Sequence, residues 1–156
     1  MVAEPAREIL AEQRATGGTA TAELDPARFV ELLLERSIEK HRAASREAAP
    51  TMFDRAVPDC IAYAEQLEVD PEPSRLAAAT IRYAPRILVL EPWEAIYTTD
   101  DERRMPFEAT IPFHERIVSA YETLGYEAVI IPRVGLSDRV AFVLEELERA
   151  RRDASG

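Results

Sequence analysis

Two short, continuously apolar segments place the strongest limit on what this chain can fold into. Residues 86–90 (RILVL) and 128–131 (AVII) lack the alternation of polar and apolar side chains that marks a strand with one face in water. Such segments are typical of strands that are covered on both faces. Segments with apolar residues at helical spacing precede, separate and follow them. Apolar strands that alternate with helices predict an α/β domain with a mainly parallel sheet.

Two further short strands are expected in the first third of the chain. One covers residues 2–4 and ends at Pro5, and the other covers residues 50–55 and stops at a charged pair. Right-handed crossovers between parallel strands place helices on both faces of the sheet, so we expect three layers. Residues 1–150 are predicted to form one domain, and residues 151–156 a disordered tail.

Six segments have the spacing of helices, and some of them carry signals for their ends. Asp25 followed by Pro26 is typical of a helix start, and Gly125 is typical of a helix end. Residues 15–22, rich in glycine and threonine, predict a flexible loop. The predicted helices cover residues 6–14, 26–48, 58–67, 73–83, 107–124 and 136–151.

The composition excludes several classes of function. Cys60 is the sole cysteine, so an intramolecular disulfide and a cysteine-rich metal site are excluded, and the two histidines lack the spacing of a zinc site. The formal net charge of -10 argues against sequence-independent nucleic-acid binding, although a local arginine cluster can still hold a small phosphate ligand. Because the chain has no long apolar run and no signal-peptide pattern, we expect a cytoplasmic protein without a membrane span.

Charged residues stand at the ends of the expected strands. Glu4 ends the first strand, Asp54 and Arg55 end the second, Glu91 ends the third, and Arg133 follows the fourth. In an open parallel α/β sheet, ligands bind at the carboxyl ends of the strands. A carboxylate there can hold Mg²⁺ or take a proton from a hydroxyl, and an arginine can pair with phosphate oxygens. This edge therefore predicts a phosphate-directed site.

Each of these residues also has a simpler explanation. Glu4 is equally well explained by a favourable place at the start of the next helix. Asp54 is explained by a solvated or capping role, and the charged run over residues 100–104 by a soluble loop. Trp93 and Tyr97 are able to stack on a ring, although core packing is the more ordinary role for them.

Several stretches, in the same order over nearly the whole chain, resemble a bacterial family of AAA-type P-loop ATPases related to nucleoside and nucleotide kinases. The three that carry most of the resemblance are EPAREI, FDRAVPD and YTTDDERR, at residues 4–9, 53–59 and 97–104. Similar segments follow at residues 114–116 and 121–126, and in the strand that ends at residues 132–133.

The resemblance implies a site that uses ATP and Mg²⁺ for phosphoryl transfer to a small-molecule acceptor, or for ATP hydrolysis. Glu4 resembles the strand-end acid that serves as catalytic base in nucleoside kinases. Asp54 and Arg55 resemble an acid–arginine pair, in which the acid helps to hold the metal indirectly or the substrate and the arginine contacts phosphate. These roles are positional and electrostatic, as phosphoryl transfer requires.

The resemblance also assigns roles to later residues. Arg103 and Arg104 lie where such kinases carry a lid, whose arginines close over the phosphates and exclude water. The loop that begins at Arg133 lies where related enzymes contact the adenine base.

One expected motif is missing from the chain. Members of the resembled family begin with a strand, a GxxxxGK[ST] loop and a helix, and this loop cradles the phosphates. Here the adjacent glycines Gly17 and Gly18 are followed by no GK pair, and Lys40, the sole lysine, lies in a predicted helix. In that family the missing strand lies at the centre of the sheet, between the second and third strands named above. We therefore expect those two strands to pair directly or to present open apolar edges, with self-association as a result.

Three explanations of the missing loop stay open: a start codon placed too late, a decayed gene, and a protein that works without the loop. The resemblance implies an ATP-binding, kinase-like domain, and the missing loop leads us to expect that it is inactive as written. The alternative is a degenerate domain, without a phosphate loop, that serves as a protein-interaction or regulatory module.

Overall fold

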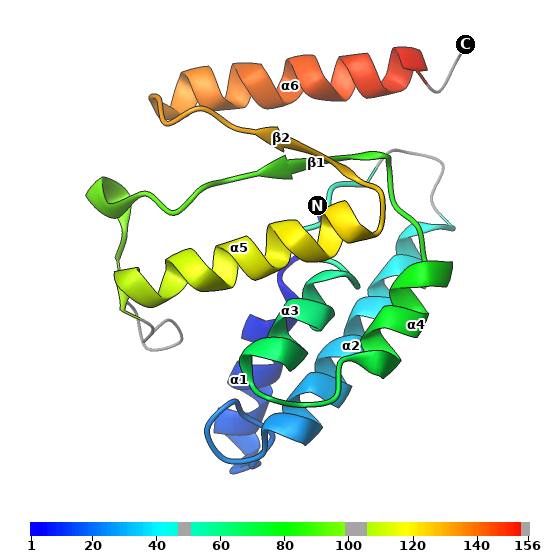
Figure 1. Cartoon of the computed structure of the whole chain (residues 1–156), viewed down its shortest axis with the longest axis vertical. Coiled ribbons are helices and arrows are strands. Elements are labelled where there is room, and N and C mark those ends of the chain that lie inside the picture. The colour runs from blue at the N-terminus through cyan, green and yellow to red at the C-terminus, as the bar shows by residue number, and fades with distance from the viewer. Residues whose placement is uncertain (47–50, 99–105, 154–156) are drawn as a thin grey trace. The chain divides into compact units, whose positions relative to one another are not determined.

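The computed structural model describes residues 1–46, 51–98 and 106–153. They form two compact units, of which unit 1 holds the described residues up to 82 and unit 2 holds the described residues from 83 onwards (Figure 1). Helices prevail in both units, and each unit contains a parallel pairing of extended segments. The chain is thus a helix-rich α/β protein with a small parallel sheet, which confirms the predicted class in its coarse form. Among the described residues, no helix is both long and apolar enough to cross a membrane.

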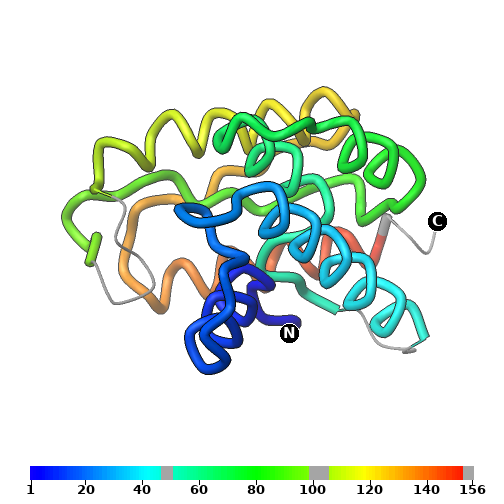
Figure 2. The backbone as a smooth tube through the Cα atoms, turned by 90° about the horizontal axis from the view of Figure 1, so that it is seen from below, coloured from blue at the N-terminus to red at the C-terminus, as the bar shows by residue number. Residues whose placement is uncertain are grey.

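Helices occupy most of the described residues of unit 1. They are α1 (Pro5–Thr16), α2 (Pro26–Ala44), α3 (Asp59–Gln66) and α4 (Glu72–Thr80). Each helix packs against the next one in the chain, α1 on α2, α2 on α3 and α3 on α4. The backbone can be followed in Figure 2 from α1 through the loop at residues 17–25 into α2.

The ends of these helices follow from local residue chemistry. The Asp25 side chain accepts a hydrogen bond from the backbone N–H of Arg28 at 3.0 Å, and Pro26 occupies the first turn of α2, which confirms the predicted start. Helix α1 ends at Gly17, which has a left-handed backbone with φ of 69° that glycine adopts without a steric penalty.

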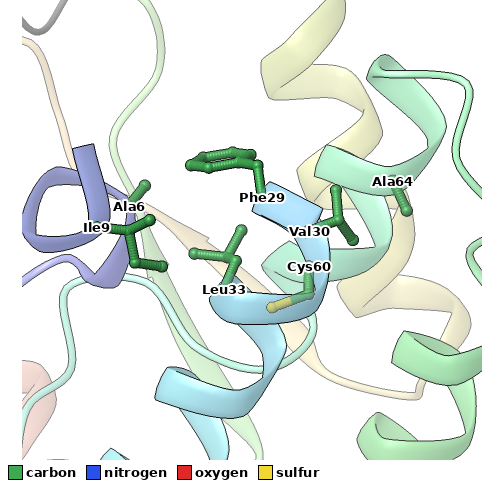
Figure 3. Close-up of a cluster of buried hydrophobic side chains, with 7 residues drawn as sticks. All are labelled: Ala6, Ile9, Phe29, Val30, Leu33, Cys60 and Ala64. Atoms are coloured by element: carbon green, nitrogen blue, oxygen red, sulfur yellow. The ribbon is translucent and has the colours of Figure 1, made fainter. Parts of the chain in front are cut away.

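The core of unit 1 is formed where α1, α2 and α3 meet (Figure 3). Ile9 is fully buried, and Phe29 is 2% exposed. The ring of Phe29 also meets that of Tyr63 edge to face, with centroids 6.0 Å apart. The buried members of the cluster are Ala6, Ile9, Phe29, Val30, Leu33, Cys60 and Ala64.

The two strands predicted in the first third of the chain are reduced to a single bridge among the described residues. Val2 pairs in parallel with Phe53. The N–H of Val2 donates to the carbonyl of Met52 at 2.8 Å, and the N–H of Asp54 donates to the carbonyl of Val2 at 2.9 Å. The parallel direction agrees with the prediction, but the predicted strand length is wrong, because this pairing does not extend beyond one residue of each segment.

Unit 2 contains the regular strands. Its elements are β1 (Arg86–Val89), the short 3-10 helix η1 (Glu94–Ile96), α5 (Phe107–Thr123), β2 (Glu127–Ile130) and α6 (Leu136–Asp153). The strands β1 and β2 pair in parallel, with register partners that run from Arg86 and Glu127 to Val89 and Ile130. Helix α5 connects them and packs against β2. It is followed by Gly125 at φ of 82°, in agreement with the predicted helix end.

The apolar segments that predicted fully covered strands are covered only in part. Val89 and Ile131 are buried, but Leu90 is 61% exposed and Ile130 is 45% exposed. The prediction of complete coverage is therefore wrong for Leu90 and Ile130. Among the described residues the sheet of unit 2 consists of β1 and β2 alone; Ile130 ends β2, and Leu90 directly follows β1.

Candidate functional site

The candidate site lies in unit 1, where the chain leaves the parallel bridge between Val2 and Phe53. Because the bridge is parallel, the residues that follow it leave the sheet at the same edge. Glu4 follows Val2, and Asp54 and Arg55 follow Phe53. The structure therefore brings together three of the residues that the sequence analysis selected.

Arg55 has an unusual backbone. Its φ of 67° lies in the left-handed region, which few residues other than glycine and asparagine adopt. Its side chain lies back along the start of α3, where Nη1 donates to Oδ1 of Asp59 at 3.1 Å. Burial alone would lower the pKa of Arg55, but the negative charge of Asp59, with smaller contributions from Tyr63 and Glu4, outweighs it and raises the pKa.

Asp59 is a buried acid that accepts hydrogen bonds from both a side chain and the backbone. It is 3% exposed and lies in the first turn of α3. In addition to Arg55, the backbone N–H of Ala56 donates to Oδ2 of Asp59 at 2.8 Å. Since buried carboxylates are stable only when they are paired and hydrogen-bonded, these contacts make Asp59 a fixed anchor for the loop between residues 55 and 59.

Glu4 lies between a cation and a phenol. The Nε of Arg7 donates to Oε2 of Glu4 at 3.2 Å, and the hydroxyl of Tyr63 donates to Oε1 at 3.5 Å. Burial raises the pKa of Tyr63, and the nearby charge of Glu4 raises it further. Glu4 occupies the N-cap position of α1 but makes no side-chain capping bond. The N-cap position agrees with the simpler explanation of a favourable charge at the helix start, and the contact with Tyr63 also places the carboxylate beside α3.

Asp54 differs from Glu4 in its surroundings. Its side chain is exposed, and its backbone N–H is the group that joins the bridge. The resemblance pairs Asp54 with Arg55, whereas the ion pair of Arg55 in the structure is with Asp59. Asp54 is therefore placed to meet a ligand or solvent.

The single lysine supports the segment that carries Glu4. The Nζ of Lys40 donates to the carbonyl of Ala3 at 3.1 Å and to Oε1 of Glu8 at 2.6 Å. Arg36, one turn earlier on α2, donates through Nη1 and Nη2 to the carboxylate of Glu12 at 2.9 and 3.0 Å. These contacts tie α1 to α2 and give Lys40 a structural role.

Unit 2 has its own charged residues after its strands. Nη2 of Arg133 lies 3.3 Å from Oε2 of Glu91, and both side chains are about half exposed. The guanidinium of Arg139 lies over the ring of Trp93, at 5.6 Å from its centroid. Tyr97 meets Phe107 edge to face, with centroids 5.5 Å apart. Trp93 and Tyr97 thus contact neighbours within unit 2.

The two predicted lid arginines, Arg103 and Arg104, lie outside the described residues. Their assignment remains an expectation of the resemblance. The same holds for the contact of Arg133 with a nucleotide base, since the structure shows only its pairing with Glu91.

Comparison with known protein families shows which family the chain belongs to. The model of a family described as "AAA domain" matches residues 1–139. The chain belongs to this AAA domain family. Neither curated proteins nor solved structures give a significant match. Membership of the AAA domain family supports a nucleotide-binding domain of the P-loop class, and it implies the use of nucleotide and Mg²⁺ in general.

The donor groups of this AAA domain fit Mg²⁺ only in part. Among the described residues, no cluster of three or more histidine, cysteine, aspartate or glutamate side chains is able to hold a metal ion. Mg²⁺ in phosphoryl-transfer sites is usually bound by one or two carboxylates together with phosphate oxygens and water. The exposed Asp54 fits the role of such a carboxylate, whereas Asp59 is already engaged by Arg55 and Ala56.

Sequence reasoning missed Asp59 and Tyr63 as members of this site. It assigned Asp59 only to the start of a helix, and it gave Tyr63 no role. The signal that was available is spacing: Asp59 lies four residues after Arg55, and Tyr63 four residues after Asp59, which places the acid and the phenol on one face of a helix.

Proposed function

We propose that this AAA domain is an ATP-binding, kinase-like domain for phosphoryl transfer to a small molecule, with Glu4 as catalytic base and Arg55 as phosphate contact. We also propose that its 156 residues alone catalyse no such transfer. The observation that carries the first part is the convergence of Glu4 and Arg55 after the parallel bridge, supported by Tyr63 and Asp59. An acid and an arginine at the carboxyl end of parallel strands are suited to this chemistry.

The two residues have complementary tasks in this proposal. The carboxylate of Glu4 accepts the proton of the acceptor hydroxyl as that oxygen attacks the phosphoryl group. The guanidinium of Arg55 stabilises negative charge on the phosphoryl oxygens through charge-assisted hydrogen bonds. Bound Mg²⁺ would neutralise further phosphate charge, and Asp54 would hold it through a water molecule.

The phosphate loop is the part that these residues do not supply. The 156 residues contain no GxxxxGK[ST] segment, so the backbone cradle and lysine of such a loop must come from outside them for catalysis to occur. In each unit the parallel pairing is internal to that unit, between Val2 and Phe53 and between β1 and β2. A domain whose sheet lacks its middle strand would keep one strand pairing on each side of the gap. The two separate pairings therefore support the proposal that the strand and phosphate loop are missing from these residues.

Phosphate release from Mg-ATP tests the proposed inactivity. The chain of 156 residues is expected to release phosphate no faster than a buffer blank. Turnover that disappears in an Asp54→Ala variant would overturn this proposal, because it would show catalysis without the loop. The coding DNA upstream of Met1 gives a second test. An in-frame GxxxxGK[ST] within about forty codons supports the enzyme, and an immediate stop codon rejects it for this chain.

Where such a loop is found, the extended chain tests Glu4 directly. A Glu4→Gln variant is expected to lower kcat by about 10²–10⁴-fold, the range for loss of a general base. Unchanged kcat in a folded Glu4→Gln variant would reject Glu4 as the base.

A second candidate function is an interaction module that associates with its own copies. Its support is a set of exposed apolar side chains on one face of α6, where Leu136, Val140 and Leu144 are 70%, 49% and 55% exposed. Sedimentation velocity over a range of concentrations tests it. We expect association that a Val140→Glu variant weakens, and a monomer at every concentration would reject it.

A further inference from the structure

We infer that Asp59 is a positioning residue, which fixes the guanidinium of Arg55 in the orientation that binds a phosphate or diphosphate group. This inference rests on the proposed function, and it assigns to the loop between residues 55 and 59 the task of preparing the site before the ligand arrives. A site whose charges are held in place in advance loses less free energy in ordering when the ligand binds.

The first support is the way in which Asp59 itself is held. It is 3% exposed, and its two carboxylate oxygens accept from two different donors of the same loop. Oδ2 accepts from the backbone N–H of Ala56 at 2.8 Å, and Oδ1 accepts from Nη1 of Arg55 at 3.1 Å. A buried acid that is fixed by the backbone provides a more rigid anchor than an acid on a mobile surface side chain.

The second support is the backbone of Arg55. Its φ of 67° directs the side chain back to the start of α3, where Asp59 stands. A turn with no further task would favour glycine or asparagine at this position, since both adopt this conformation readily. Backbone strain at a residue that also carries the charge of a site is a common sign of a functional constraint.

The third support is that binding to Asp59 leaves part of Arg55 available. A guanidinium carries five N–H groups, and the bond to Asp59 engages those of Nη1. The side chain of Arg55 is 37% exposed, against 4% for that of Asp59. The acid thus holds the guanidinium from the buried side, and the Arg55 side chain is the more exposed member of the pair. Glu4 accepts from Tyr63 on α3, the helix that also carries Asp59, the partner of Arg55, so both functional groups lie against the same helix.

A simpler explanation is that Asp59 and Arg55 form an ion pair that only stabilises the loop. Observation of the Arg55 side chain by NMR separates the two explanations, with inorganic pyrophosphate as the probe. The Arg55 Nε–Hε signal is assigned by its absence in Arg55→Lys. In the wild-type chain we expect slow rotation of this guanidinium and a saturable shift of its signal when pyrophosphate is added.

The test variant is Asp59→Asn, and the control is Glu65→Gln. Glu65 lies on the same helix and pairs with Nη2 of Arg75 at 2.7 Å, at a more exposed position outside the site. Asp59→Asn, with its fold checked by circular dichroism, is expected to free the rotation of Arg55 and to weaken pyrophosphate binding at least fivefold. Glu65→Gln is expected to change neither.

The possible results are distinguishable. A folded Asp59→Asn variant with wild-type rotation and wild-type affinity overturns the inference. Where that variant does not fold, the wild-type chain decides: slow rotation of Arg55 together with a saturable shift on addition of pyrophosphate supports the inference, and rotation as fast as that of Arg75, or no shift, overturns it. A wild-type chain that binds no pyrophosphate, although Asp59→Asn frees Arg55, leaves the ion pair with a stabilising role alone; it overturns the inference together with the phosphate contact of the proposed function.

Discussion

Truncation of Phe29 tests whether one apolar core holds the helices of unit 1 together. Phe29 is 2% exposed and is among the largest of the fully buried side chains. Replacement of a buried phenylalanine by alanine lowers the free energy of unfolding by about 3–5 kcal/mol. Of this loss, about 0.5–1.5 kcal/mol is expected from the edge-to-face contact with Tyr63. Phe29→Leu should therefore lose the aromatic contact but keep much of the packing, and cost about 1–2 kcal/mol.

Urea unfolding gives the measurement, and the chain offers a matched control. Leu76 on α4 is 63% exposed, so Leu76→Ala should change the free energy of unfolding by no more than about 0.5 kcal/mol. Circular dichroism reports the helices of both units, whereas fluorescence of Trp93, the sole tryptophan, reports unit 2. A loss below about 1 kcal/mol in Phe29→Ala, or one equal to that of Leu76→Ala, would refute the proposed core. A Trp93 transition that shifts with the circular dichroism would show that the two units unfold together.

Three further predictions concern single residues of unit 1. Burial raises the pKa of Cys60 to about 12 in the folded chain. As the pH rises, the thiol therefore loses its proton in the unfolded chain before it does so in the folded chain. The free energy of unfolding should fall as pH rises above about 8.5, and it should fall less steeply in Cys60→Ala. Urea unfolding midpoints at pH 8 and pH 10 check this prediction. An equal decrease of the midpoint between these pH values in the wild-type chain and in Cys60→Ala would contradict it. Asp25→Ala should cost about 0.5–2 kcal/mol through loss of the cap of α2, whereas Asp25→Ser should restore most of it in the same assay. Gly17→Ala should cost about 1 kcal/mol from backbone strain alone, because no atom lies within 4 Å of an added Cβ; an unchanged thermal midpoint would contradict this.

The helices were the part of the fold that sequence could predict. Asp25, Pro26 and Gly125 act locally, so their effect on helix ends does not depend on distant residues. The strands were less predictable, because a strand needs partners. Residues 50–55 are apolar enough for a strand but pair through Phe53 alone among the described residues. The exposure of Leu90 likewise depends on which helices pack against this segment, which its own sequence does not determine.

The candidate site was predictable to a similar extent. The rule that ligands bind at the carboxyl ends of parallel strands selected Glu4 and Arg55, and in the structure both follow the parallel bridge between Val2 and Phe53. The role of Asp59 was not predictable from the same rule. It depends on a left-handed backbone at Arg55, and sequence patterns seldom reveal such a conformation at a residue other than glycine.

The backbone of Arg55 also bears on how this chain would respond to selection. At φ of 67°, a residue other than glycine costs roughly 1–2 kcal/mol, so a library that varies position 55 and is sorted for thermal stability alone should enrich glycine and asparagine. A library sorted for retention of an anionic ligand should keep arginine. At position 55, a substitution that stabilises this domain is thus expected to weaken the binding of an anionic ligand. Redesign that is based on consensus or on stability should leave this position unchanged.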